Sequence, residues 1–149
     1  MFSTTRSIDR GLLLIRAALG IVFVMHGGQK LFQFGYEGVT AGMAGAGLPF
    51  PALSAAVIIA VELLGGIALL TGAFTRLFAF LLAGAMSVAM VTVHLANGFF
   101  LPTGVEFTLT LALVNLGLVF TGAGAYSIDA LMAHAPRTGE SSRHFPAAA

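Results

Sequence analysis

Residues 52–74 read ALSAAVIIAVELLGGIALLTGAF, and Glu62 is the one charged residue in this stretch. A helix needs about 20 predominantly apolar residues to cross the hydrocarbon layer of a membrane, so the stretch predicts a transmembrane helix. A charged side chain near the middle of such a helix costs roughly 2.5–3.5 kcal/mol on insertion scales and usually faces a protein interior, where it has a partner. Glu62 is therefore the first candidate for a functional residue.

The composition of the whole chain agrees with a membrane protein. Of 149 residues, 58% are hydrophobic and only 9% are charged, and the mean hydropathy is +0.97. The absence of cysteine excludes disulfides, thiolate metal sites, iron–sulfur clusters and a dithiol relay within this chain. Redox chemistry would need a bound cofactor or a partner. A net charge of +1 without a basic block gives no indication of nucleic-acid binding.

Four apolar segments predict an all-α fold, an integral membrane four-helix bundle, with helices at about 11–28, 52–74, 77–95 and 104–121. Four crossings place both termini on the same side. That side carries most of the basic residues, whereas the opposite loops carry only Lys30, so we expect both termini in the cytoplasm; these basic residues are Arg6, Arg10, Arg76, Arg137 and Arg143. The alternative, a cleaved signal peptide over residues 1–25, is disfavoured by Arg16, which interrupts its apolar region.

The remaining segments follow from their composition. Residues 1–10 are expected to be a cytoplasmic N-terminal segment, and residues 11–132 the membrane domain. The glycine-rich connection from residue 27 to 51 contains several aromatic residues, which predicts an interfacial segment with a short helix near Tyr36 to Met43. Ser127 resembles a helix N-cap, and residues 133–149 are expected to form a disordered cytoplasmic tail.

Arg16 and Glu62 are the first candidate pair. At about 1.5 Å per residue, Arg16 lies roughly 7 Å into its helix, and Glu62 roughly 14–18 Å from the cytoplasmic end of the next helix. An arginine side chain can span much of that difference. One interpretation is a structural ion pair that joins two helices; the other is a site that binds a polar head group or relays a proton through Glu62.

A second polar group is expected at the outer helix ends, and Lys30 lies on nearly the same helical face as Arg16. Ordinary explanations remain open: Thr103 and Glu106 have the spacing of a capping box, and the interfacial residues could reach lipid head groups. With the first pair, this group gives the candidate ligand-binding set: Arg16, His26, Lys30, Glu62, His94, Asn97 and Glu106.

Two histidines at matching depth also raise the question of haem or metal. Imidazole pairs hold haem iron, and His/Glu sets bind zinc or iron, but no spacing in this chain is diagnostic. We therefore expect neither a haem nor a metal ion.

Taken together, the motifs resemble the DoxX-like family of bacterial membrane proteins over residues 10–132. The matching elements are Arg16 with Leu19-Gly20, the stretch His26-Gly27-Gly28-Gln29-Lys30-Leu31, Gly47-Leu48-Pro49 with Pro51, Val61-Glu62 with Gly65-Gly66, Leu70-Thr71-Gly72 with Arg76, His94, Glu106, and Ser127-Ile128-Asp129. The resemblance implies a four-helix protein of the bacterial cytoplasmic membrane with a redox association. Some relatives are the membrane subunit of a thiosulfate-oxidising, quinone-reducing enzyme, and others join complexes that handle thiol or oxidative stress.

The leading hypothesis is a membrane subunit or quinone-interacting protein of an oxidoreductase system, with a polar site built on Glu62 and Arg16. Whether the chain is itself catalytic stays open. A carrier or binding protein for a small anion, lipid or other amphiphile is the alternative, and a scaffold that recruits redox enzymes is the third. The expected partners are the lipid bilayer, a non-covalently bound quinone, soluble redox proteins and further copies of the chain.

Overall fold

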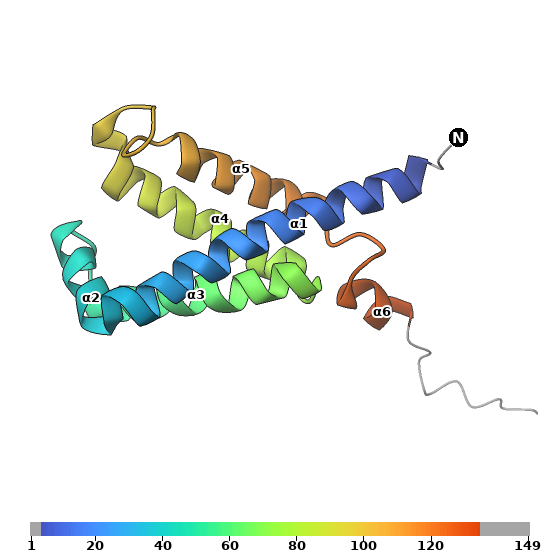
Figure 1. The fold of residues 1–149 in the computed structure, drawn as a ribbon, viewed down its shortest axis with the longest axis horizontal. Helices are drawn as coiled ribbons and strands as arrows, with labels where there is room; N and C mark the ends of the chain where they lie inside the picture. Colours follow the sequence, from blue (N-terminus) through green and yellow to red (C-terminus); the bar gives the residue numbers. More distant parts are fainter. Residues whose placement is uncertain (1–3, 135–149) are drawn as a thin grey trace, which may run out of the picture.

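The structure is a computed structural model that describes residues 4–134, and every regular element in this range is helical (Figure 1). The prediction of an all-α fold is therefore confirmed. A π-helical turn, Lys30–Phe34, follows the first helix, and Met90–His94 with the 3-10 turn Leu95–Asn97 extends the fourth. The six α-helices are α1 (Thr4–Gln29), α2 (Gly35–Gly45), α3 (Pro51–Thr71), α4 (Thr75–Ala89), α5 (Glu106–Thr121) and α6 (Ile128–His134).

The four long helices pack in two pairs. Helix α1 packs mainly on α3, and α4 packs mainly on α5. A tight turn joins α3 to α4 close to α6, and the two pairs diverge from there toward the end of the molecule that carries α2 (Figure 1). We call these the α6 end and the α2 end. A cavity lies between the pairs at the α2 end.

Glycines allow α1 and α3 to approach closely. A Cβ atom on Gly20 would lie 2.8 Å from the carbonyl oxygen of Gly66, and one on Gly66 would lie 2.7 Å from the backbone nitrogen of Val24. Neither position has room for a side chain unless the two backbones separate. Small residues give helix pairs in lipid the close van der Waals packing that replaces the hydrophobic driving force of soluble bundles.

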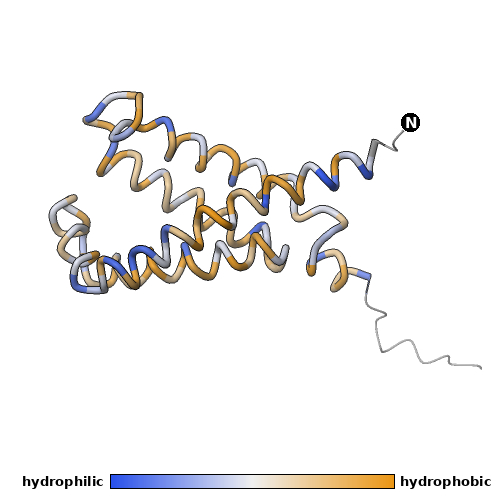
Figure 2. Tube along the Cα trace, viewed as in Figure 1, coloured by the Kyte–Doolittle hydropathy of each residue, from blue (hydrophilic) through white to orange (hydrophobic). Residues whose placement is uncertain are grey.

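The core lies between the helix pairs near the α6 end and contains Phe23, Leu69, Leu82 and Leu118, all fully or almost fully buried. Large apolar side chains are exposed on every long helix, and Figure 2 shows that hydrophobic residues predominate along these helices. Water-soluble monomers rarely expose contiguous apolar surface on this scale, whereas a lipid-facing surface requires it. The fold thus has an apolar exterior around a smaller, better packed interior.

Within residues 4–134, two stretches are long and apolar enough to cross a membrane by length and composition, Pro51–Thr71 and Thr75–Asn97. Helix α5 is also apolar but shorter, with 16 residues. Four membrane crossings therefore stay a prediction. The structure supports two of these four spans.

The helix bounds differ from expectation mainly at the start of the chain. Helix α1 begins at Thr4 and not at Gly11, because the polar residues before Gly11 continue the helix beyond its apolar part. The short helix expected between residues 27 and 51 is present as α2, and α6 begins at Ile128, where Ser127 Oγ accepts a hydrogen bond from the backbone N–H of Ala130. Most of the expected tail, residues 135–149, lies outside the described residues, as do Arg137 and Arg143.

We expect Gly66→Ala to destabilise the protein by about 1–3 kcal/mol, because the added methyl group forces α1 and α3 apart. The matched control is Gly84→Ala in α4, where an added Cβ meets no atom within 4 Å. The thermal midpoint of each purified variant in one detergent checks this. An equal effect of both substitutions would contradict the close α1–α3 contact.

Candidate functional site

Glu62 forms an ion pair with Lys30. The Nζ atom of Lys30 lies 2.6 Å from Oε2 of Glu62 and donates a hydrogen bond to it. The Glu62 side chain is only 2% exposed and that of Lys30 is 21% exposed. The isolated carboxylate of α3 thus has a cation from the π-helical turn that follows α1.

The direction of side chains on antiparallel helices explains this pairing. Gly20 lies against Gly66, and Gly27 lies against Leu63, so α1 and α3 run in opposite directions. Side chains on a helix tilt toward its N-terminus. Side chains of α1 therefore lean toward the α6 end and those of α3 toward the α2 end. Lys30 and Glu62 lean toward one another as a result.

Arg16 leans away from Glu62, and the pair suggested by the sequence is not the one observed. Its guanidinium donates hydrogen bonds to the carbonyl oxygens of Leu69 at 3.2 Å and Tyr126 at 2.6 Å. Arg16 is fully buried, and a Cβ atom on Gly72 would collide with its Nη1. The expected depths of Arg16 and Glu62 suggested that the arginine side chain could reach the carboxylate. The Arg16 side chain leans toward the α6 end, however, and so away from Glu62.

Arg16 belongs instead to a cluster that ties the C-terminal segment to the α6 end. Asp129 accepts hydrogen bonds from the backbone nitrogens of Phe74 at 2.7 Å and Thr75 at 2.9 Å, which caps α4. Asp9 accepts one from the backbone nitrogen of Ala125 at 3.0 Å. These side chains all bind backbone groups, which is the pattern of a structural anchor.

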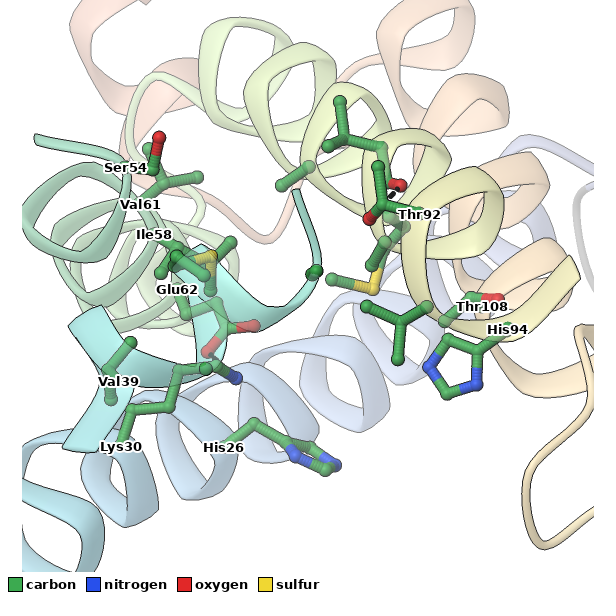
Figure 3. Close-up of a pocket in the computed structure, with 18 of the residues that line it drawn as sticks. His26, Lys30, Val39, Ser54, Ile58, Val61, Glu62, Thr92, His94 and Thr108 are labelled. Atoms are coloured by element: carbon green, nitrogen blue, oxygen red, sulfur yellow. Dashed lines mark hydrogen bonds and ion pairs between the residues drawn. The ribbon is translucent and has the colours of Figure 1, made fainter. Parts of the chain in front are cut away.

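The Lys30–Glu62 pair lies in the wall of a cavity of about 890 Å³ at the α2 end (Figure 3). His26 and His94 also line it, so four of the seven predicted site residues meet here. Most other lining residues are apolar and come from every helix from α1 to α5; among them are Phe23, Val39, Met43, Val57, Val61 and Met86. Figure 3 shows His26 and Lys30 projecting from α1 toward the space that Glu62 faces.

Three hydroxyl side chains in the wall are already bonded to nearby backbone. Ser54 donates to the carbonyl of Pro49, Thr92 to that of Val88, and Thr108 to that of Val105, at 2.9–3.0 Å. Each hydroxyl uses its hydrogen locally. The other polar side chains in the wall are the ion pair and the two imidazoles.

The two histidines are held differently. Nδ1 of His94 lies 2.7 Å from the carbonyl oxygen of Thr103, and since a carbonyl only accepts, Nδ1 carries the hydrogen. In the neutral ring Nε2 is then the acceptor. The ring of His26 lies against that of Phe107 on α5, with centroids 6.1 Å apart. His94 therefore has a fixed tautomer, and the His26 ring lies between α1 and α5.

The family model described as DoxX matches residues 11–95, more than half of the chain. The protein belongs to the DoxX family. Its match includes Lys30, Glu62 and His94.

Three similar proteins extend the likeness of this DoxX chain beyond residue 95. A Bacillus subtilis protein named "Putative oxidoreductase CatD" is 36% identical and covers 83% of this chain and 88% of its own. Two Escherichia coli proteins, the inner membrane proteins YphA and YqjF, are 30% and 35% identical, cover 85% and 83% of this chain, and 98% and 93% of their own. No solved structure shows significant similarity to the chain.

Asn97 and Glu106, although expected in the site, do not line the cavity of this DoxX protein. Asn97 donates to the carbonyl of Val93, and Glu106 accepts a hydrogen bond from the backbone nitrogen of Leu101 at 2.7 Å. Glu106 thus binds backbone in the loop before α5, although not through the proposed capping box with Thr103. Similar depth placed both residues with the site, but their side chains turn to the chain between α4 and α5.

Helix α2 is the part of the site that the sequence missed. Val39 of α2 is buried against Ala55 and Ile59 of α3, and this contact holds α2 against α3. Gly38, Gly42 and Met43 of α2 line the cavity. The available signal was the pattern of Val39 and Met43 one turn apart. Within residues 4–134, no group of three or more His, Asp or Glu side chains is placed to hold a metal ion.

We expect Lys30→Met to destabilise the DoxX protein by on the order of 3 kcal/mol, because it leaves the buried Glu62 carboxylate without a partner. Adding Glu62→Met should restore much of the loss, since replacement of a whole buried ion pair by apolar residues is often neutral. Thermal midpoints of the two single variants and the double variant check this, with the exposed Glu37→Met as control. Additive losses in the double variant would contradict the pair.

Proposed function

We propose that this DoxX protein is a multi-pass subunit of a redox system in the bacterial cytoplasmic membrane and binds a quinone in the cavity beside Lys30 and Glu62. The observation that carries the proposal is a buried ion pair opening into a largely apolar cavity. Membership of the DoxX family and the name of the Bacillus subtilis relative support the redox association. The names of the two Escherichia coli relatives support the membrane.

In this proposal α1, α3, α4 and α5 all cross the bilayer and both termini lie in the cytoplasm. The basic residues Arg6, Arg10 and Arg76 lie on the parts of α1 and α4 that belong to the α6 end, whereas Lys30 is at the α2 end. Retention of basic residues in the cytoplasm therefore favours the α6 end as cytoplasmic. The cavity then opens in the outer half of the membrane.

The cavity suits a quinone in size and in chemistry. Its volume of about 890 Å³ lies within the range of roughly 300–1,000 Å³ that is typical of small-molecule sites. A quinone head presents carbonyl oxygens that accept hydrogen bonds, and Lys30 Nζ is a charged donor at the wall. The apolar lining suits the ring and the tail.

The same residues can handle protons. Reduction of a quinone takes up electrons and protons in equal number. Glu62 accepts or releases a proton when its bond to Lys30 changes, and His94 Nε2 provides a second exchangeable position. The chain has no cysteine to carry electrons, so we propose that a partner protein delivers them. Glu62 and Lys30 then position the head group and exchange protons with it.

We expect Glu62→Gln and Lys30→Met to weaken quinone binding by roughly tenfold or more, because a hydrogen bond to a charged group contributes about 1.5–3 kcal/mol. Titration of the purified protein in lipid nanodiscs with a long-tailed quinone checks this. The matched control is Asn97→Ala, whose side chain bonds to its own helix outside the cavity. Thermal midpoints show whether each variant is folded.

Three other results would each contradict a part of this proposal. Native-like quinone affinity in folded Glu62→Gln protein would contradict the site. Binding of a lipid or other amphiphile without any quinone binding would favour a carrier. If the variants recover less partner protein but bind the ligand with native affinity, a scaffold would be favoured.

A further inference from the structure

The cavity continues from its polar groups into an apolar groove between α3 and α4. On α4, Leu81, Ala85 and Val88 line it at spacings of four and three residues, which is one face of a helix. On α3, Val57 and Val61 line the facing side. The groove follows α4 for about 10 Å between Leu81 and Val88, at 1.5 Å per residue.

The groove opens on the outside of the molecule. Val57, Leu81 and Val88 line the cavity, and yet they are 51%, 38% and 49% exposed. A residue that does both lies at the rim of an opening. Since α3 and α4 are the two helices long and apolar enough to cross a membrane, this rim faces lipid in the proposed topology.

The polar groups of the cavity come from several helices, with Glu62 next to Val61 on α3, whereas the groove residues come from α3 and α4 alone. Lys30 and His26 come from α1 and its extension, and His94 from the end of α4, whereas the five groove residues are all apolar. Figure 3 shows Glu62 close to Lys30 and on the same helix as Val61, with Thr92 of the π-helical turn after α4 across the cavity. The rings of His26 and Phe107 lie in contact between α1 and α5. A ligand with a polar head and an apolar tail thus fits in one orientation.

We propose that the groove lined by Val57, Val61, Leu81, Ala85 and Val88 holds the apolar tail of the ligand whose head lies at Lys30 and Glu62, and that the tail reaches it from the bilayer between α3 and α4. This inference rests on the proposed function, and it adds the class of ligand: an amphiphile with a long isoprenoid or alkyl chain. A small water-soluble ligand without a tail would leave the groove without an occupant.

The test compares two quinones with the same head, one with a long isoprenoid tail and one without a tail. Ala85→Phe fills the groove at its half-buried centre, and Val57→Phe narrows the rim. The control is Val91→Phe in the π-helical turn after α4; Val91 does not line the cavity and is 59% exposed. Binding is measured in nanodiscs, and thermal midpoints identify variants that do not fold.

Ala85→Phe and Val57→Phe should lower the affinity ratio of tailed to tail-less quinone by at least about tenfold, because the added ring occupies the space in which the tail packs. The control should keep the native ratio. A native ratio in folded groove variants would overturn the tail groove while leaving the head-group site intact. Failure of the native protein to bind either quinone would contradict the proposed function itself.

A second measurement does not depend on the groove variants. A quinone with a photoreactive diazirine at the end of its tail should label peptides of α3 and α4 that contain residues 57–61 and 81–88. Competition by the unmodified tailed quinone should abolish labelling, whereas competition by phospholipid alone would assign the groove to a bilayer lipid and overturn the proposal. Labelling confined to α1 and α5 would also overturn it.

Discussion

The close packing of α1 against α3 determines which charged groups of this protein meet. Gly20 and Gly66 bring the two backbones so near that neither position has room for a side chain. The antiparallel register that follows sets Lys30 against Glu62 and Arg16 against the last turn of α3. Because side chains lean toward the N-terminus of their own helix, Lys30, on the α2 side of Glu62, leans toward Glu62, whereas Arg16, on its α6 side, leans away. The ion pair and the anchor are two consequences of one contact.

The part of the site that the sequence predicted is the part that helix periodicity and hydropathy control. Glu62 is conspicuous in an apolar stretch, and Lys30 falls on the helical face of Arg16, so both were expected to face the interior. The choice of partner for Glu62 needed the register of α1 and α3, which depends on packing between residues far apart in the chain. Asn97 and Glu106 show the same limit, since a similar depth says nothing about direction.

The fold shows a corresponding division. The apolar stretches predicted the long helices and the glycine-rich connection predicted α2, because local composition decides both. The place of α2 over the cavity depends on Val39 packing against Ala55 and Ile59, a contact that no local pattern encodes. The two π-helical turns, Lys30–Phe34 and Met90–His94, also arise where helices reach the cavity, and such turns occur frequently at functional sites.

The charged side chains at the two ends of the molecule find partners of different kinds. At the α6 end, Arg16, Asp9 and Asp129 bind backbone groups and so fix the chain ends and helix caps. At the α2 end, Lys30 and Glu62 bind each other beside a cavity. A buried ion pair is weak evidence for stability, since apolar replacements are often as stable. The glycine contact and the hydrogen bond from Arg16 to Leu69 already join α1 to α3, so the fold does not need the ion pair for this purpose. Stability alone therefore does not explain the pair.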